Sequence, residues 1–238
     1  GAGSCVHSRI GSHVAAQRVV EFLLAASEQV DAALAGDAAK LKEFLAAQVT
    51  AAAVAATDAL GELAKKAGSS PKDFRCTLLT VLHYHAEAHD WLLTNQIGDG
   101  AICVLRADKS TVRLGASDSG AHSGEVSCFV PDDCAREKAK RIEVIADLSG
   151  VECVLLCSDG IEDPFYPLEK QAAAIFQQFY TGVTVPLPDF KAQLPQPAPL
   201  AQESAAWGLA QWLEFEKRGE NDDRTVAVLQ RLPQMISY

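Results

Sequence analysis

The sequence VECVLLCSDG, residues 151–160, gives the clearest indication of the fold. Apolar side chains occupy both faces of the extended segment 151–157, which is typical of a strand in the middle of a sheet. Ser158-Asp159-Gly160 follows with residues that favour a turn. This stretch therefore predicts a central strand that places a carboxylate, Asp159, at the end of the strand.

Other short apolar segments, separated by turn residues, surround this strand in the sequence. Their pattern predicts antiparallel strands. The expected strands cover residues 74–84, 91–97, 101–106, 111–114, 126–130 and 225–232. Residues 142–148 are expected to form a hairpin with 151–157 around Ser149-Gly150.

Two long amphipathic helices are expected before the strands. Apolar residues three and four apart over 19–34 predict the first helix, which Ser12 can cap. Asp37 can cap the second, which Gly68 ends. A single corner joins the helices, so we expect them to lie antiparallel on a shared surface. Further helices are expected over 168–180 and 200–218.

Antiparallel strands combined with helices in pairs predict an α+β layered sandwich. The sequence shows no internal repeat and no domain boundary, so we expect one domain over residues 1–238. The proline-rich loop 183–199 is a candidate lid, because long loops of this kind lie on protein surfaces and often cover sites.

Composition restricts the classes of partner. The formal net charge of -10 argues against nucleic acid, which requires a basic face. The acidic surplus is explained either by solubility or by carboxylates that gather around divalent cations. No signal peptide and no long uncharged apolar stretch are found. We expect a cytoplasmic monomer with no membrane partner.

The cysteines are odd in number and include no Cys-x-x-Cys pair, so a zinc site is not expected. Several lie in apolar segments, which predicts buried, reduced thiols in a reducing compartment. The seven are Cys5, Cys76, Cys103, Cys128, Cys134, Cys153 and Cys157.

Three acidic residues lie where predicted strands end or begin: Asp99, Asp159 and Asp222. Each alone is explained by a turn. Together they could hold Mg²⁺ or Mn²⁺, which prefer carboxylate oxygens, and two such ions can activate a water for attack on phosphorus. The chain has no Cys-x5-Arg loop and no Gly-x-Ser-x-Gly motif, which agrees with chemistry that needs no covalent nucleophile.

The order of these motifs resembles the metal-dependent serine/threonine protein phosphatases of the 2C type, and most closely their compact bacterial branch. The likeness extends over nearly the whole chain. The motifs that carry it are Gly1-Ala2-Gly3-Ser4, Asp73 to Leu79, Gln96 to Gly100, Gly124 to Phe129, Leu156 to Ile161 and Asp222 to Val226.

The resemblance implies a four-layer α/β/β/α sandwich of two antiparallel sheets flanked by paired helices. It implies two or more Mg²⁺ or Mn²⁺ ions and hydrolysis of phosphoserine and phosphothreonine in a protein substrate. By this resemblance the catalytic residues Asp159 and Asp222 ligate the metals, the Gly1 carbonyl contacts the second metal, and Asp99 supports a third, weaker one.

The sequence also departs from the family pattern. The Asp that bridges both metals in the family would precede Gly1, and the strands before it are missing here as well. From this we expect a domain truncated at its N-terminus, whose metal affinity would fall without the bridging carboxylate.

Two other functions stay open. One is a catalytically degenerate domain that binds a phosphoprotein or regulator, and the other is a hydrolase of small phosphate esters. His83 and His85 would share one face of a strand, which suggests either a metal pair or solvated histidines. Arg9 and Arg224 could hold phosphate or form structural ion pairs.

Overall fold

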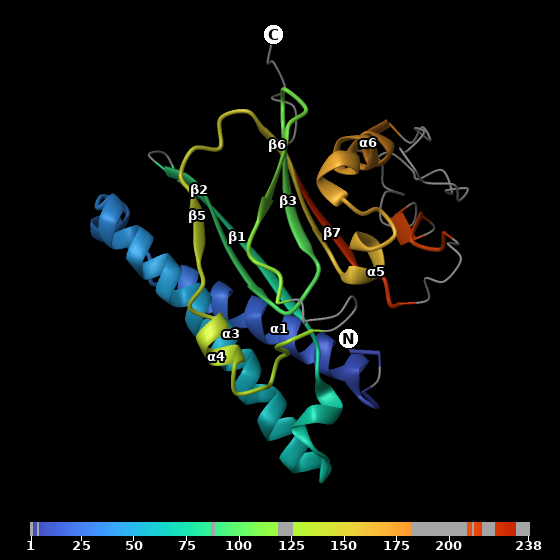
Figure 1. Cartoon of the computed structure of the whole chain (residues 1–238). Coiled ribbons are helices and arrows are strands. Elements are labelled where there is room, and N and C mark those ends of the chain that lie inside the picture. The colour runs from blue at the N-terminus through green and yellow to red at the C-terminus, as the bar shows by residue number, and fades with distance from the viewer. Residues whose placement is uncertain are drawn as a thin grey trace. The chain divides into compact units, whose positions relative to one another are not determined.

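The computed structural model describes residues 2–3, 5–86, 89–118, 126–181, 209–210, 212–215 and 222–231. The chain forms two compact units. Unit 1 comprises Gly1–Asp99 and Gly115–Ser149, and unit 2 comprises Gly100–Leu114 and Gly150–Tyr238. Each unit contains one antiparallel sheet and helices (Figure 1). The expected α+β fold with two antiparallel sheets is confirmed, while the single phosphatase-like domain stays a prediction.

The helices of unit 1 are α1 (Ser8–Ser27), α2 (Ala32–Ala35) and α3 (Ala38–Ala67). Two predicted boundaries of α3 are confirmed. The Asp37 carboxylate accepts the N–H of Lys40 at 3.1 Å at the start of the helix. Gly68 ends it with φ of 65°, a left-handed conformation that favours glycine.

The prediction of a single helix over 19–34, capped by Ser12, is wrong. α1 begins at Ser8 and ends at Ser27, and the Ser12 hydroxyl lies inside it, donating to the carbonyl of Arg9. Asp31 caps a new helix by accepting the N–H of Leu34 at 2.8 Å. A capping side chain competes with continuation of the preceding helix, so the apolar stripe is divided between α1 and α2.

Helices α1 and α3 lie alongside each other in unit 1 (Figure 1). Ala15 and Val19 of α1 pack against a stripe on α3 that includes Ala52, Ala56 and Leu60. By length and composition alone α3 would be apolar enough to cross a membrane. A core helix satisfies the same criterion, and the apolar stripe of α3 is buried in this cluster.

The sheet of unit 1 has the order β1-β2-β5 and is antiparallel. Its strands are β1 (Leu78–Ala86), β2 (His89–Ile97) and β5 (Glu143–Ile145). Leu78 lies opposite Ile97, and both pack with α1 and α3. The face of odd-numbered β2 residues therefore covers the helices, and the even-numbered residues lie on the other face.

Two predicted strands of unit 1 are wrong in part. Residues Pro71–Phe74 form a 3₁₀ helix, η1, started by a capping box at Ser70, so β1 begins at Leu78 instead of Phe74. The segment 126–130 is no regular strand in the described chain. It contributes an isolated bridge between Val130 and Cys76 and leads to the short helix α4 (Ala135–Lys138).

The sheet of unit 2 has the order β4-β3-β6-β7 and is antiparallel. Its strands are β3 (Ala101–Arg106), β4 (Thr111–Leu114), β6 (Val151–Cys157) and β7 (Val226–Gln230). The central position of β6 is confirmed. The predicted hairpin of 142–148 with 151–157 is wrong, because β3 and β7 already pair with both edges of β6, and β5 pairs with β2.

The helices of unit 2 are α5 (Asp159–Glu162) and α6 (Leu168–Thr181). Its core is aromatic: Phe165 stacks on Trp212 with ring centroids 5.5 Å apart, and Phe176 and Phe215 belong to the same buried cluster. The predicted helix over 200–218 is described only in fragments, and the proline-rich loop 183–199 lies outside the described residues.

Candidate functional site

The turn Gly98-Asp99-Gly100 follows β2 and precedes β3. Gly98 and Gly100 have φ of 94° and 92°, which side chains rarely adopt. A Cβ atom on Gly98 would also lie 2.5 Å from Cγ2 of Thr77. The backbone that carries Asp99 therefore requires glycine on both sides, and Asp99 itself is half-buried.

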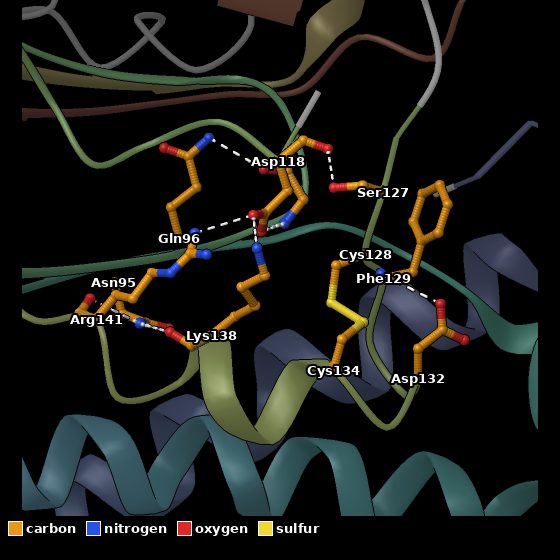
Figure 2. Close-up of polar contacts among 11 residues, drawn as sticks. Asn95, Gln96, Asp118, Ser127, Cys128, Phe129, Asp132, Cys134, Lys138 and Arg141 are labelled. Atoms are coloured by element: carbon orange, nitrogen blue, oxygen red, sulfur yellow. Dashed lines mark hydrogen bonds and ion pairs between the residues drawn. A yellow bond between two sulfur atoms is a disulfide. The ribbon is translucent and has the colours of Figure 1, made fainter. Parts of the chain in front are cut away.

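A buried carboxylate, Asp118, holds this turn from within unit 1 (Figure 2). Its side chain is 2% exposed and accepts the N–H of Gly98 at 3.1 Å. The Asp118 N–H donates to the Gly98 carbonyl at 2.9 Å, so each residue bonds to the other. Lys138 and Arg141 both form ion pairs with the carboxylate, the latter at 2.9 Å. Asp118 is thus a positioning residue for the turn.

The two basic residues are held by β2. The Asn95 side-chain amide donates to the carbonyls of Lys138, Ala139 and Arg141 at 3.1, 3.3 and 3.0 Å. These bonds satisfy carbonyl groups at the C-terminal end of α4, which otherwise lack partners within the helix. One strand therefore supports both the acidic turn at its end and the cations that neutralise Asp118.

A disulfide between Cys128 and Cys134 lies beside this network (Figure 2). Ser127, the residue before Cys128, donates its N–H to the Asp118 carbonyl at 2.7 Å, and Cys134 immediately precedes α4. The expectation that all cysteines are reduced is wrong for this pair. The sequence separation of six gave no motif, but residues 128–134 fold back into a loop that brings the two sulfur atoms together.

The described free cysteines in the two sheets and their connections are unsuited to nucleophilic chemistry. Burial raises the pKa of Cys76 and of Cys103 to about 12, and that of Cys153 to about 11. Such thiols are protonated near neutral pH, and the thiolate is the reactive form.

In unit 2, Ser158 connects the segments that carry Asp159 and Asp222. Its hydroxyl donates to the Asp223 carbonyl at 3.1 Å and accepts the N–H of Thr225 at 3.0 Å. The Ser158 N–H donates to the Thr225 carbonyl at 3.1 Å. A Cβ atom on Gly160 would lie 2.6 Å from the Asp223 carbonyl oxygen. Asp159 therefore has neighbours on both sides that contact the 223–225 segment.

Arg113 adds a partly buried charge pair to unit 2. Its guanidinium pairs with Glu162 of α5, and donates to the Gly100 carbonyl at 2.9 Å. Burial raises the pKa of Glu162, while the hydrogen bond from Arg113 opposes the shift. A Cβ atom on Gly100 would lie 2.5 Å from the Cys157 carbonyl oxygen. The residue after Asp99 thus packs against the end of β6, directly before Ser158.

The predicted site residues fall into three groups. Asp159, half-buried, and Asp222, exposed, lie on neighbouring segments of unit 2. Asp99 belongs to unit 1, and Gly1 lies outside the described residues. The available donors are carboxylate and backbone oxygens, which suit Mg²⁺ or Mn²⁺. A metal site shared by all these residues stays a prediction.

Sequence reasoning missed Asp118. It lies in Ala116-Ser117-Asp118-Ser119-Gly120, which reads as an ordinary polar turn. Its partners Gly98 and Lys138 are each 20 residues away along the chain, so no local pattern connects them. The basic residues Lys138 and Arg141 lie 20 and 23 residues after Asp118, too far along the chain to act as a local signal.

Arg224, considered for phosphate binding, has a structural role in unit 2. It donates to the Leu213 carbonyl at 2.8 Å and to the carbonyl of Phe215. Its guanidinium carbon lies 3.8 Å from the centroid of the Phe215 ring. These contacts attach the segment before β7 to the aromatic core, which gives Arg224 a structural role.

The sequence matches the family model described as Protein phosphatase 2C over residues 1–196. None of the curated proteins matches the chain.

The fold is similar to that of a C. elegans sex-determining protein, with a TM-score of 0.58 and 15% identity. That likeness covers 91% of this chain and 52% of the other, so this chain spans about half the length of that protein. The serine-threonine phosphatase 2C of Toxoplasma gondii matches with a TM-score of 0.44 and 14% identity, covering 69% and 64% of the two chains. Likeness at such low identity concerns the fold.

Proposed function

Because this chain belongs to the protein phosphatase 2C family, we propose that it hydrolyses phosphoserine and phosphothreonine esters of proteins. The observation that supports this most is the pairing of the Asp159 and Asp222 segments through Ser158. Two carboxylates on neighbouring, hydrogen-bonded segments of one unit offer the hard oxygen ligands that metal-assisted phosphoryl chemistry uses.

In this proposal Asp159 and Asp222 hold Mg²⁺ or Mn²⁺, two ions or more. A bound divalent ion supplies Lewis-acid activation of water and neutralises charge on the phosphate. The chain's own residues keep the ligands in position. Ser158 fixes the two segments to each other, and Asp118 fixes the turn that carries Asp99. The glycines on either side of Asp99 let that turn pack closely against its neighbours in the chain.

The test is turnover of a phosphothreonine peptide by the intact protein, including any residues encoded before Gly1. Activity should require Mn²⁺ or Mg²⁺ and should stop with EDTA. Asp159→Asn and Asp222→Asn should each lower turnover at least about a hundredfold, because each removes a charge that the ions need. The matched control is Asp58→Asn, an exposed aspartate paired with Arg136, which should keep normal turnover.

Two outcomes would contradict the proposal. Near-normal turnover in both variants would show that Asp159 and Asp222 are not the metal ligands. Binding of the phosphopeptide without turnover at any metal concentration would favour the non-enzymatic alternative, a domain that recognises a phosphoprotein or regulator. Comparison with a small phosphate ester on the same preparation tests the substrate class, since faster turnover of the ester would overturn the protein specificity.

We also propose a monomer in the cytoplasm with no membrane or nucleic-acid partner. Five free cysteines favour a reducing compartment, whereas the Cys128–Cys134 disulfide counts against one. Fractionation of cells tests the location, and size-exclusion chromatography tests the oligomeric state. A secreted protein or a stable dimer would contradict them.

A further inference from the structure

The end of the β1–β2 hairpin at which Ala86 lies opposite His89 carries an unusual group of side chains. His83 and His85 are alternate residues of β1, and Asp90 of β2 lies opposite His85 in the register. Alternation places all three on the face of the sheet that is turned away from α1 and α3. Nε2 of His83 lies 2.7 Å from Oδ1 of Asp90, and Nδ1 of His85 lies 3.4 Å from the same oxygen.

We propose that His83, His85 and Asp90 bind one divalent ion of the borderline class, such as Zn²⁺. One ligand atom from each residue lies within 4.8 Å of the other two. Within the described parts of the chain, no other set of three histidine, cysteine or acidic side chains meets this condition. Two imidazoles and one carboxylate are the ligand set of known three-ligand zinc sites, with a fourth position open to water.

The chemistry of the ligands selects the class of ion. Imidazole nitrogen suits Zn²⁺, Cu²⁺ and Ni²⁺, whereas Mg²⁺ and Mn²⁺ prefer oxygen. The side chains are accessible, with exposures of 38% for His83, 72% for His85 and 33% for Asp90. The existing contacts of Asp90 with both rings hold the imidazoles close together before an ion arrives, which lowers the cost of ordering them.

The group is separate from the turn that carries Asp99. Asp90 and Gly98 lie near opposite ends of β2, about 27 Å apart along an extended strand of eight residue steps. The ion would connect β1 to β2 near the pair Ala86 and His89, where one strand leads into the next, while the proposed phosphatase ions would be held by oxygen ligands elsewhere. This inference therefore does not depend on the proposed function.

The test is a Zn²⁺ titration of the intact, EDTA-treated protein in saturating Mg²⁺, read through competition with a chromophoric chelator. Wild type should bind one equivalent tightly. His83→Gln, His85→Gln and Asp90→Asn should each weaken this binding at least about tenfold, since even the supporting contacts of metal ligands contribute that much. His89→Gln is the matched control, because His89 belongs to the same hairpin but lies on the opposite face of the sheet. Its ring centroid is 4.5 Å from that of Trp91.

A second measurement does not depend on variants. Histidine ring signals in the NMR spectrum of the wild-type protein should shift with Zn²⁺ for His83 and His85 and stay in place for His89 and His13. Equal Zn²⁺ affinity in the wild type and the His83 and His85 variants would overturn the proposal. So would ring shifts confined to histidines outside the group.

Discussion

The turns that carry Asp99 and Asp159 are held by opposite means. In unit 1, the turn at Asp99 depends on one buried carboxylate, Asp118, which bonds to Gly98 and is neutralised by two cations. In unit 2, the turn at Asp159 depends on backbone groups and one neutral hydroxyl, that of Ser158.

The difference matters because removing one partner costs a different amount of stability in the two kinds of interaction. Removing one partner of a buried ion pair leaves an uncompensated charge, which costs several kcal/mol. Removing a neutral hydrogen bond costs about 1 kcal/mol. Substitutions of Asp118, which holds the first turn, should therefore lower stability strongly. Substitutions of Ser158, which holds the second turn, should lower it little.

The largest effect is expected for Asp118→Asn. The change leaves Lys138, whose side chain is 20% exposed, without its anionic partner, and should lower the free energy of unfolding by about 3 kcal/mol. Urea unfolding followed by circular dichroism measures it. Asp58→Asn, which breaks an exposed pair with Arg136, should cost less than about 1 kcal/mol. Equal costs for the two variants would show that Asp118 has no special role.

The disulfide beside Asp118 gives the next largest effect. Cys134→Ser, or reduction of the wild type, should lower the free energy of unfolding by about 2 kcal/mol, since a short closed loop restricts the unfolded chain modestly. Thermal unfolding with and without dithiothreitol measures this. Cys5→Ser, which changes a free cysteine, should leave the reductant effect intact. No effect of reductant on the wild type would mean that the bond is not formed in solution.

A smaller effect is expected for Ser158→Ala in unit 2. Its hydroxyl makes two hydrogen bonds to the 223–225 segment, but the backbone bond between Ser158 and Thr225 stays, so the loss should be about 1 kcal/mol. Turnover should fall as well, because the Asp159 and Asp222 segments lose the two hydroxyl hydrogen bonds that join them. Ser110→Ala, in an exposed turn, is the control. Unchanged turnover in Ser158→Ala would show that Ser158 does not position the proposed metal ligands.

The smallest effect concerns the charge pair of unit 2, Arg113 and Glu162. Burial raises the pKa of Glu162, so its carboxyl favours the folded state when protonated. That contribution is present below the pKa of the unfolded state and is lost as pH rises through the higher pKa of the folded state. Wild type should lose stability relative to Glu162→Gln as pH rises above about 4, the usual pKa of a glutamate in an unfolded chain. Urea unfolding of both proteins at several pH values measures this. A difference in free energy of unfolding that stays constant with pH would contradict the prediction.

Local patterns predicted much of the fold. β3 and β4 begin and end where their short apolar segments and turn residues indicated. Asp37 and Gly68 bound α3 as expected, because caps and turns act over a few residues. The central position of β6 also followed from its apolar character.

Interactions between distant residues were not predictable in this way. The partner of β5 depends on which edges β3 and β7 occupy, and that choice is made by tertiary structure. The network of Asp118 and the disulfide likewise join residues that no periodicity connects. For the candidate site, sequence indicated the acidic turns but not what holds them.

The division of the chain has a consequence for its synthesis. The β3–β4 hairpin belongs to unit 2 but emerges from the ribosome between two portions of unit 1. Its neighbour β6 starts at Val151, 45 positions after β3 ends at Arg106. At typical translation speeds the open edge of β3 waits about 2 to 9 seconds for that strand. An unpaired apolar edge invites pairing with other chains, so this hairpin is exposed to misassembly until β6 has been made.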